Sequence, residues 1–372
     1  MPAAVVEPFA EILRDVPGYL RSLTGRSRPI IGYFCTHTPI ELIHAAGFLP
    51  VRIFGGTVEV DLAYTLAPSF VCPPMLRSLE AALGGAYDSL AGVVQGYTCD
   101  VACGMVNIWQ EAFPGIMCHT LPLPYNDCVE GRDFLRAALM ELIAKLERLG
   151  GHFTSEGLTR SLDVYAAIRH SLLDLYRLRY AGLLPLVADD FYDIIHAAFI
   201  VAPEEYLTML HELKGSLEEV SPPSTEGVPV LVAGSIIEDS SVFKILESVG
   251  ARVVADDLCT GFRPFHTPDG EGPEPIERLM DRYLRRLPCP SRCRAEERLP
   301  MILELIRLSK AQGVVFLLQK FCTPHLADEP VLRRALSQEG IRSLVVELEA
   351  TGIHAGQLTT RLQSFVEMLK ES

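Results

Sequence analysis

Residues 313–330, GVVFLLQKFCTPHLADEP, decide the predicted fold. Residues 314–318 form a short, continuous apolar run between Gly313 and a polar turn, which is typical of a strand buried on both faces of a parallel sheet. The turn carries Cys322, and a helix is predicted at residues 328–336. A cysteine at the carboxyl end of a parallel strand lies at the edge where open α/β sheets bind their ligands.

The same alternation of strand, turn and helix runs through most of the chain. Further strands are predicted at residues 29–34, 49–53, 90–94, 115–121, 228–233, 251–255 and 343–347. Residues 132–220 instead have helical spacing, and residues 221–227 have the composition of a linker. The sequence therefore predicts an α/β protein with two Rossmann- or flavodoxin-like parallel-sheet domains, residues 1–131 and 221–372, joined by a helical segment, residues 132–220.

Local signals place some helix ends. Residues 7–23 read as one amphipathic helix, and Thr38 is the predicted N-cap of a helix that has Pro39 in its first turn. A helix that starts at Asp100 would place Cys99 and Cys103 on one face.

Composition excludes several classes of function. The chain has 372 residues, enough for two or three domains, and its formal net charge of −14 argues against nucleic-acid binding. No apolar run is long enough to span a membrane, and the N-terminal stretch lacks the basic start and apolar core of a signal peptide. We therefore expect a cytoplasmic protein that binds neither nucleic acid nor membrane.

Ten cysteines are the unusual feature of the sequence. A disulfide framework is not expected in a cytosolic chain of this size, and Cys118 is predicted to be a buried packing residue. Four cysteines directly follow predicted strands and a fifth precedes a predicted helix: Cys35, Cys99, Cys259 and Cys322, and Cys72. Because the carboxyl ends of parallel strands meet at one edge, we expect these thiols to approach one another. Thiolates suit iron–sulfur clusters or zinc, and helix N-termini favour the thiolate form.

Other residues offer alternative chemistry. Cys99 and Cys103, with Cys289 and Cys293, have spacing compatible with a structural zinc site, although packing is the simpler role for Cys103. His37 and His325 lie close in sequence to Cys35 and Cys322 and are either proton donors near a metal site or ordinary turn residues. Gly234-Ser235 weakly resembles a phosphate-binding turn, and Asp256-Asp257 are more often turn caps than a cation site.

Six stretches resemble the 2-hydroxyacyl-CoA dehydratase family (D-component), which also contains benzoyl-CoA reductase subunits and double-cubane cluster proteins. They are GYFCTHTPIELIHAAGFLPVRI (32–53), CPPMLRS (72–78), TCD (98–100), VVADDLCTGFRPF (253–265), KFCTPHLADEP (320–330) and GQLTTRLQSFVEML (356–369). They follow the family's order over nearly the whole chain.

The resemblance implies a [4Fe-4S] cluster bound by Cys72, Cys99 and Cys322, with one iron open to substrate. It also implies a lyase that removes water from a 2-hydroxyacyl-CoA through a ketyl radical. The electron would come from an ATP-dependent activator protein, and the chain would work with a related subunit or as a homodimer. No catalytic acid or base and no particular acyl group is implied.

Two alternative functions remain open at this point. One is a benzoyl-CoA reductase-like or double-cubane-type ATP-dependent reductase, and another is a non-catalytic scaffold or cluster-maturation partner. A double-cubane [8Fe-9S] cluster is the less expected cofactor, because such proteins carry a cysteine between the positions of Cys72 and Cys99 that this chain lacks. The sequence leaves open whether Cys35, Cys259, Cys289 or Cys293 also bind metal.

Overall fold

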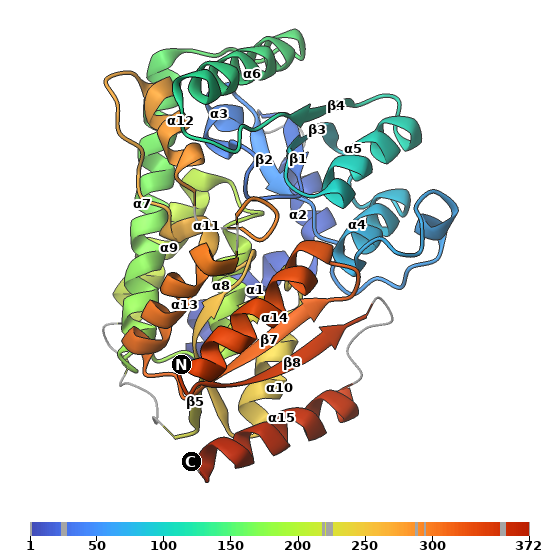
Figure 1. Ribbon diagram of the computed structural model, residues 1–372. Coiled ribbons are helices and arrows are strands. Elements are labelled where there is room, and N and C mark those ends of the chain that lie inside the picture. Colours follow the sequence, from blue (N-terminus) through green and yellow to red (C-terminus); the bar gives the residue numbers. More distant parts are fainter. Residues whose placement is uncertain are drawn as a thin grey trace.

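A computed structural model describes residues 2–23, 28–217, 220, 226–286, 289–293, 295–349 and 355–371. Residues 221–225 of the predicted linker lie outside this range. In the described chain, eight strands form two four-stranded sheets in which every pairing is parallel (Figure 1). This confirms the predicted α/β class and its two parallel sheets.

The strands coincide with the eight predicted apolar runs. The first sheet contains β1 (Ile30–Tyr33), β2 (Leu49–Arg52), β3 (Leu90–Gly96) and β4 (Met117–Leu121), in the order β2-β1-β3-β4. The second contains β5 (Val228–Gly234), β6 (Ala251–Asp257), β7 (Gly313–Gln319) and β8 (Arg342–Leu348), in the order β6-β5-β7-β8. Each sheet thus starts with an inner strand, adds one neighbour on one side and then two on the other.

Fifteen α-helices and one 3₁₀ turn, η1 (Leu62–Thr65), accompany the sheets in the described residues. The helices are α1 (Pro2–Arg14), α2 (Val16–Leu23), α3 (Ile40–Ala45), α4 (Pro73–Leu83), α5 (Asp100–Ala112), α6 (Val129–Arg148), α7 (Ser155–Tyr180), α8 (Ala188–Ala197), α9 (Pro203–Leu217), α10 (Ser241–Ser248), α11 (Arg263–His266), α12 (Pro275–Leu284), α13 (Ala295–Ser309), α14 (Thr323–Gln338) and α15 (Ala355–Lys370). Among these, none has both the length and the apolar character that a bilayer crossing requires.

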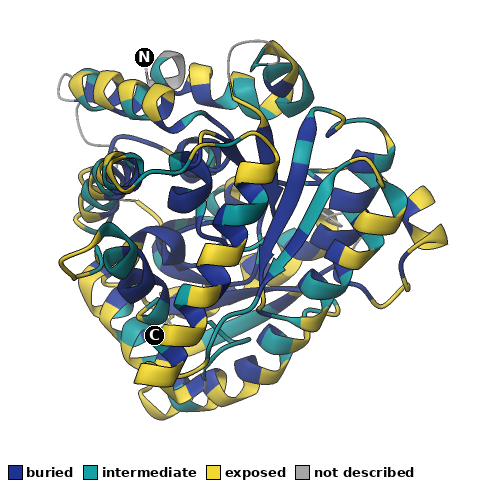
Figure 2. Ribbon diagram, turned by 90° about the horizontal axis from the view of Figure 1, so that it is seen from above, coloured by how far each residue is buried: buried dark blue, intermediate teal, exposed yellow. Residues whose placement is uncertain are grey.

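The first sheet separates two apolar cores. Successive side chains of a strand point to opposite faces, so Val93 of β3 joins the core with α4 and α5, whereas Val94 joins the core with α3 and α6. Figure 2 shows the inner strands buried and the outer faces of the helices exposed.

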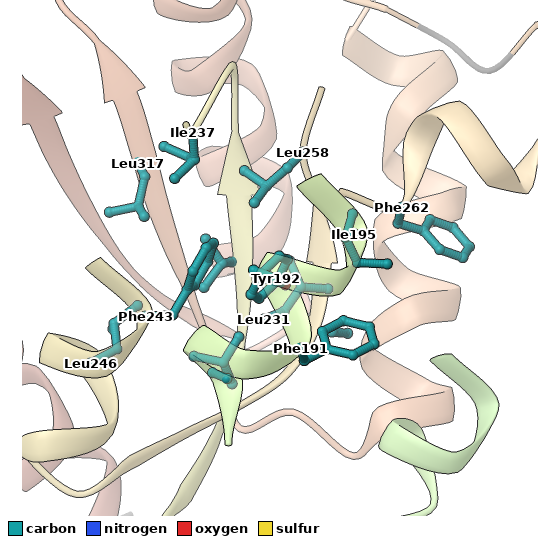
Figure 3. Close-up of a cluster of buried hydrophobic side chains, with 14 of the residues drawn as sticks. Phe191, Tyr192, Ile195, Leu231, Ile237, Phe243, Leu246, Leu258, Phe262 and Leu317 are labelled. Atoms are coloured by element: carbon teal, nitrogen blue, oxygen red, sulfur yellow. The ribbon is translucent and has the colours of Figure 1, made fainter. Parts of the chain in front are cut away.

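The second sheet is covered on both faces by helices. The helices α10 and α15 lie on one face, and α13 and α14 lie on the other (Figure 1). On the α10 side, Tyr192 of α8 stacks on Phe243 with ring centroids 3.6 Å apart, above Leu231 of β5 (Figure 3). The helical region 132–220 therefore contributes directly to the core of the second sheet.

Two helices pack away from their neighbours in sequence. The first helix, α1, packs against α8 and α9 and places Phe9 in the core of the second sheet. Conversely α12, which follows β6 in the chain, places Leu279 and Met280 in the core between the first sheet, α3 and α6. Each half of the protein is thus completed by a helix from the other half.

A buried carboxylate joins α3 to the later helices. Glu41 accepts hydrogen bonds from Arg282 (3.2 Å) and Tyr283 (2.8 Å) of α12, and Arg169 of α7 lies 3.4 Å away. Although burial opposes ionisation, these arginines hold the pKa of Glu41 below its ordinary value. The network fixes α12 against the first sheet.

Several predicted helix ends were wrong. The helix predicted at residues 7–23 is interrupted at Asp15, whose carboxylate accepts a hydrogen bond from Gly18 N–H (2.8 Å). Thr38 is not an N-cap, because Pro39 precedes α3 and the Thr38 hydroxyl bonds to β3 instead, at Val94 O (3.3 Å).

Two further helices differ from expectation. The helix predicted at residues 328–336 begins at Thr323, and α8 was not predicted. Both helices carry local start signals that the prediction did not use: Pro324 lies in the first turn of α14, and Asp189 and Asp190 lie in the first turn of α8.

Truncation of Leu279 tests whether α12 belongs to the first core. Leu279 is fully buried, so Leu279→Ala should lower the free energy of unfolding by about 2–5 kcal/mol. Chemical denaturation would measure the loss, and Leu308→Ala, at an exposed position of α13, should cost less than about 0.5 kcal/mol. Equal, small losses would contradict the packing of α12 described above.

A second expectation concerns His196 of α8, which is 1% exposed and whose Nε2 has no hydrogen-bond partner in the described structure. Burial and the nearby Arg52 cation lower its pKa from 6.5 to about 3. The unfolded state therefore binds one more proton than the folded state between these pH values. Acidification should reduce the free energy of unfolding by up to about 1.4 kcal/mol per pH unit through this group.

Denaturation of His196→Gln between pH 7 and pH 4 should show a shallower loss of stability than the parent chain. The matched control is His152→Gln, at an exposed position, which should leave the slope unchanged. Identical slopes in all three proteins would show that His196 is not kept neutral.

Candidate functional site

The turns that follow the strands meet between the two sheets and enclose a cavity of about 80 Å³. We call it the inner cavity. Six of the ten cysteines line it: Cys35, Cys72, Cys99, Cys259, Cys289 and Cys322. All ten cysteines are free. The structure thus brings together the five thiols expected to approach one another and adds Cys289.

A larger cavity of about 540 Å³ lies beside the inner one. We call it the outer cavity. Cys72, Cys99 and Cys322 line both cavities, whereas Cys35, Cys259 and Cys289 line only the inner one. The three predicted cluster ligands therefore form the boundary between a small thiol-lined space and a wider pocket.

Those three boundary cysteines are all helix N-caps. Cys72 precedes α4, Cys99 precedes α5 and Cys322 precedes α14. Cys99 Sγ accepts a hydrogen bond from Ala102 N–H (3.5 Å). Free N–H groups and the positive end of the helix dipole favour an anion at each of these positions.

Close contacts bring the turns of the first sheet together. The Gln95 side chain, at the end of β3, accepts a hydrogen bond from Cys35 N–H (3.0 Å). Gly96 allows the two turns to touch, because a Cβ atom there would lie 2.4 Å from His37 O. Cys35 and Cys99 are thereby held at the point between β1 and β3 where the strand order reverses, the usual ligand site of such sheets.

The second sheet has a corresponding arrangement. Gln319, at the end of β7, donates a hydrogen bond to Ile236 O (2.7 Å) in the turn after β5. Its Oε1 atom is buried without a hydrogen-bond partner in the described residues. Gln319 also lines the inner cavity, so the site contains an acceptor that nothing in the described protein satisfies.

The backbone before Cys322 is strained. Phe321 has φ of +62°, a left-handed conformation that non-glycine residues rarely adopt. Its ring is partly exposed and Lys320 Nζ lies 5.6 Å from the ring centroid. Such strain persists where surrounding structure imposes it, and it is common at functional sites. Here it turns the chain so that Cys322 faces both cavities.

Burial keeps these thiols protonated when they carry no ligand. It raises the pKa of Cys99 to about 12 and that of Cys322 to about 11, and it also raises the pKa of Cys72 well above the ordinary value of a thiol. Neighbouring thiols add to each increase. Binding of a soft metal ion would therefore release the protons of these thiols. The positive charge of the metal would also offset the free-energy cost of burying a thiolate.

A chain of buried charges ends at the inner cavity. Asp328 pairs with Arg298, Arg298 pairs with Asp257, and Asp257 accepts a hydrogen bond from Arg263 Nε (2.5 Å). The Arg263 Nη1 atom then lies 3.2 Å from Cys259 Sγ. Although burial opposes ionisation, Arg263 and Arg298 keep the pKa of Asp257 below its ordinary value. A cation is thus directed at a thiol of the site.

The two predicted histidines also lie beside thiols. His37 Nδ1 is 3.8 Å from Cys35 Sγ, and His325 Nε2 is 3.9 Å from Cys259 Sγ. Both rings are buried, and burial with the nearby arginines lowers their pKa well below the usual value. They are therefore neutral hydrogen-bonding groups and not surface residues.

Asp256 and Asp257 are not solvated turn residues, because both are fully buried. Asp256 does cap the following turn, accepting hydrogen bonds from Leu258 N–H (3.1 Å) and Phe262 N–H (2.8 Å). It also accepts hydrogen bonds from Tyr176 and Tyr192. Its role is structural.

The spacing of the donors bears on which kind of metal site the cavity could hold. Across the ranges described above, no three Cys, His, Asp or Glu side chains are placed to hold one metal ion, so the zinc site considered for Cys99, Cys103, Cys289 and Cys293 is not formed there. A zinc ion requires sulfur ligands about 3.8 Å apart around one point. An iron–sulfur cluster instead binds each thiolate at a different iron, which suits thiols arranged around a cavity.

The remaining cysteines lie elsewhere. Cys293 lines the outer cavity only, and Cys103 is part-exposed one turn into α5. Cys118 on β4 is half-buried beside the first core, close to its predicted packing role, and Cys128 caps α6 at the surface.

The sequence analysis left open whether Cys289 binds metal and did not predict that it joins the thiols that follow the strands. Segment 289–293, which carries Cys289, is held against the first sheet by Arg292. This side chain donates a hydrogen bond to Tyr97 O (3.1 Å) and packs over the Tyr125 ring at 4.6 Å. Arg52, which lines the inner cavity, and Arg263, which contacts Cys259, were also missed. Neither follows a pattern that distinguishes it from other arginines.

Comparison with known proteins places the chain in a family. The family described as 2-hydroxyglutaryl-CoA dehydratase, D-component, matches residues 35–369. The (R)-phenyllactyl-CoA dehydratase beta subunit of Clostridium sporogenes is 27% identical over 366 residues, covering 97% of each chain. The lactoyl-CoA dehydratase beta subunit of Anaerotignum propionicum is 28% identical over 347 residues, covering 91% of each.

A subunit of a reductase has about the same sequence identity to this chain as the dehydratase subunits. One of the subunits of the benzoyl-CoA reductase of Thauera aromatica is 28% identical over 325 residues, covering 85% of this chain and 84% of its own. The family match extends over most of the chain and includes all six turns or segments that contribute thiols to the inner cavity. The protein is a member of the 2-hydroxyglutaryl-CoA dehydratase D-component family.

Proposed function

We propose that this chain is the iron–sulfur subunit of a 2-hydroxyacyl-CoA dehydratase-type enzyme. Cys72, Cys99 and Cys322 hold a [4Fe-4S] cluster between the inner and outer cavities. The observation that carries the proposal is the position of these three N-cap thiols on the boundary of both cavities. Dehydratase subunits among the relatives support the reaction class.

The cluster, when bound, supplies one low-potential electron to a thioester. The protein positions the cluster ligands and keeps water away from the inner side of the site. Three helix N-termini stabilise the thiolates, and the buried turns of both sheets exclude water from the inner side. The outer cavity, with a volume of about 540 Å³, receives the acyl end of the substrate and places it on the other side of the three ligands.

Two groups of the chain are available for proton transfer in the outer cavity. Asp100 and Glu296 line it and are exposed. Asp328 also lines it but is buried and engaged by Arg298. The first two carboxylates are therefore the ones that can accept a proton from substrate without breaking a buried ion pair.

The electron comes from an ATP-dependent activator protein, and the active assembly includes a related subunit or a second copy of this chain. The named subunits among the relatives support an assembly of more than one chain. The substrate is a 2-hydroxyacyl-CoA, and the reaction removes water.

Loss of one boundary thiol tests the cluster. Cys322→Ala should remove the visible absorption and most of the iron from anaerobically purified protein, while far-UV circular dichroism shows a folded chain. Cys128→Ala is the matched control, because Cys128 is also an N-cap cysteine but lies outside both cavities. Iron retained in Cys322→Ala, or lost equally in both variants, would overturn the ligand assignment.

Turnover tests the reaction. The chain is incubated without oxygen with a partner subunit, an activator, ATP and a set of 2-hydroxyacyl-CoA thioesters, and products are analysed by mass spectrometry. A product lighter than its substrate by the mass of one water molecule is the expected result.

One alternative has its own support, since a subunit of a benzoyl-CoA reductase is about as similar as the dehydratase subunits. A gain of two hydrogens in an aromatic acyl-CoA would identify this second activity. No turnover by a cluster-loaded assembly would favour a non-catalytic scaffold or a cluster-maturation role.

A further inference from the structure

A third cavity lies at the amino end of β6, apart from the thiol-lined site. Its volume is about 200 Å³, and it is bounded by residues 251–254 of β6, the last turn of α7 and the segment 182–187. We call it the β6 cavity. Cys259 follows the opposite end of β6, about 20 Å away along the strand. The function proposed above makes no use of this cavity.

Two arginines line the β6 cavity, and the described protein leaves a donor of each unsatisfied. Arg179, in the last turn of α7, is 6% exposed, and Arg252 lies on β6. The Nε atom of each is buried and has no hydrogen-bond partner within the described ranges. Buried polar groups almost always have a partner, so two such atoms at one cavity point to a ligand that this chain does not supply.

The nearby carboxylates balance one of the two cations. Glu247 Oε1 lies 3.7 Å from Arg179 Nη2, and its other carboxylate oxygen accepts a hydrogen bond from Ala188 N–H (2.9 Å). Burial and the Arg179 cation lower the pKa of Arg252, and Glu247 opposes them. Glu226 also lines the cavity but is exposed, so solvent screens its charge. The cavity therefore retains positive charge that a bound anion would balance.

Ordinary structural roles do not account for both arginines. Arg179 packs over the Phe191 ring, with its Cζ atom 4.7 Å from the ring centroid, which stabilises the guanidinium there. A charged residue on an edge strand such as β6 often prevents pairing with another chain. That role requires a charge in solvent, whereas Arg252 lines a cavity and its Nε atom is buried. A ligand between the two arginines explains why both line the same cavity.

One side of the β6 cavity is apolar. Leu184 and Leu186 are 3% and 5% exposed, and Val187 continues the same side. The volume of about 200 Å³ corresponds to roughly seven water molecules, which leaves room for an apolar group beside a charged one. Arginine binds a carboxylate through two parallel N–H···O bonds. A short-chain aliphatic carboxylate therefore matches both the arginines and the leucines.

We propose that the β6 cavity is a binding site for a small aliphatic monocarboxylate. Arg179 and Arg252 hold the carboxylate group, and Leu184 and Leu186 contact the aliphatic part. Binding makes and breaks no covalent bond. The site is independent of the iron–sulfur cluster, because none of its lining residues lines the inner or the outer cavity.

Thermal unfolding of the full chain with added butanoate tests the proposal, and butanamide is a neutral probe of the same shape. Butanoate should raise the unfolding midpoint, since a ligand that binds only the folded state stabilises it. Butanamide should leave the midpoint unchanged, because it carries no charge for the arginines. Both probes are compared at the same ionic strength, set with sodium chloride.

Isothermal titration calorimetry of variants then locates the site. Arg252→Gln should raise the Kd for butanoate by at least about tenfold, because it removes a charge-assisted hydrogen bond. Arg342→Gln is the matched control and should keep the parent Kd. Arg342 is an exposed arginine on β8, the other edge strand of the same sheet, and does not line the β6 cavity.

Several results would overturn the proposal. These are no binding of butanoate by the parent chain, equal binding of butanamide, or the same Kd for the parent and Arg252→Gln. Binding of inorganic phosphate without binding of butanoate would also overturn it, since the apolar side would then have no role. If circular dichroism shows that Arg252→Gln is unfolded, Arg252→Lys replaces it. This variant should also weaken binding, because an ammonium group cannot donate two parallel bonds, and an unchanged Kd would refute the site.

Discussion

The facing carboxyl ends of two parallel sheets are the constraint on which the rest of the structure depends. Each sheet directs the turns after its inner strands into the space between them, and six thiols occupy that space. Buried polar groups there need a partner from the protein or from a ligand. The helix N-termini at Cys72, Cys99 and Cys322 and the arginines at the inner end meet that need in two different ways.

The boundary cysteines and Cys259 thus receive different kinds of electrostatic support. At the boundary, the electrostatic support comes from backbone dipoles, which leave the side towards the outer cavity open. At the inner end it comes from Arg263, which is held by Asp257 and, through Arg298, by Asp328. Removing one member of such a chain leaves an uncompensated buried charge. The Cys259 side of the inner cavity is thus held by a chain of ion pairs, while the boundary cysteines face the outer cavity of about 540 Å³.

The sequence predicted the fold well where a run of apolar residues coincides with a buried strand. All eight strands were predicted, because strands buried on both faces read as continuous apolar runs bounded by turns. The approach of Cys35, Cys99, Cys259 and Cys322 followed from the same pattern. Other features depend on residues distant in sequence: the hydrogen bond from Arg292 to Tyr97 O positions the segment that carries Cys289, and the stacking of Tyr192 on Phe243 positions α8. No local periodicity encodes such contacts.

The crossing of α1 and α12 between the halves has a consequence for the order of folding. Residues 30–121 contain every strand of the first sheet, but one of its cores also requires Leu279 and Tyr283. On the ribosome, therefore, the earlier half emerges long before the helix that closes it has been synthesised. The thiol cavity is assembled only after most of the chain has been translated, because Cys289 and Cys322 both line it.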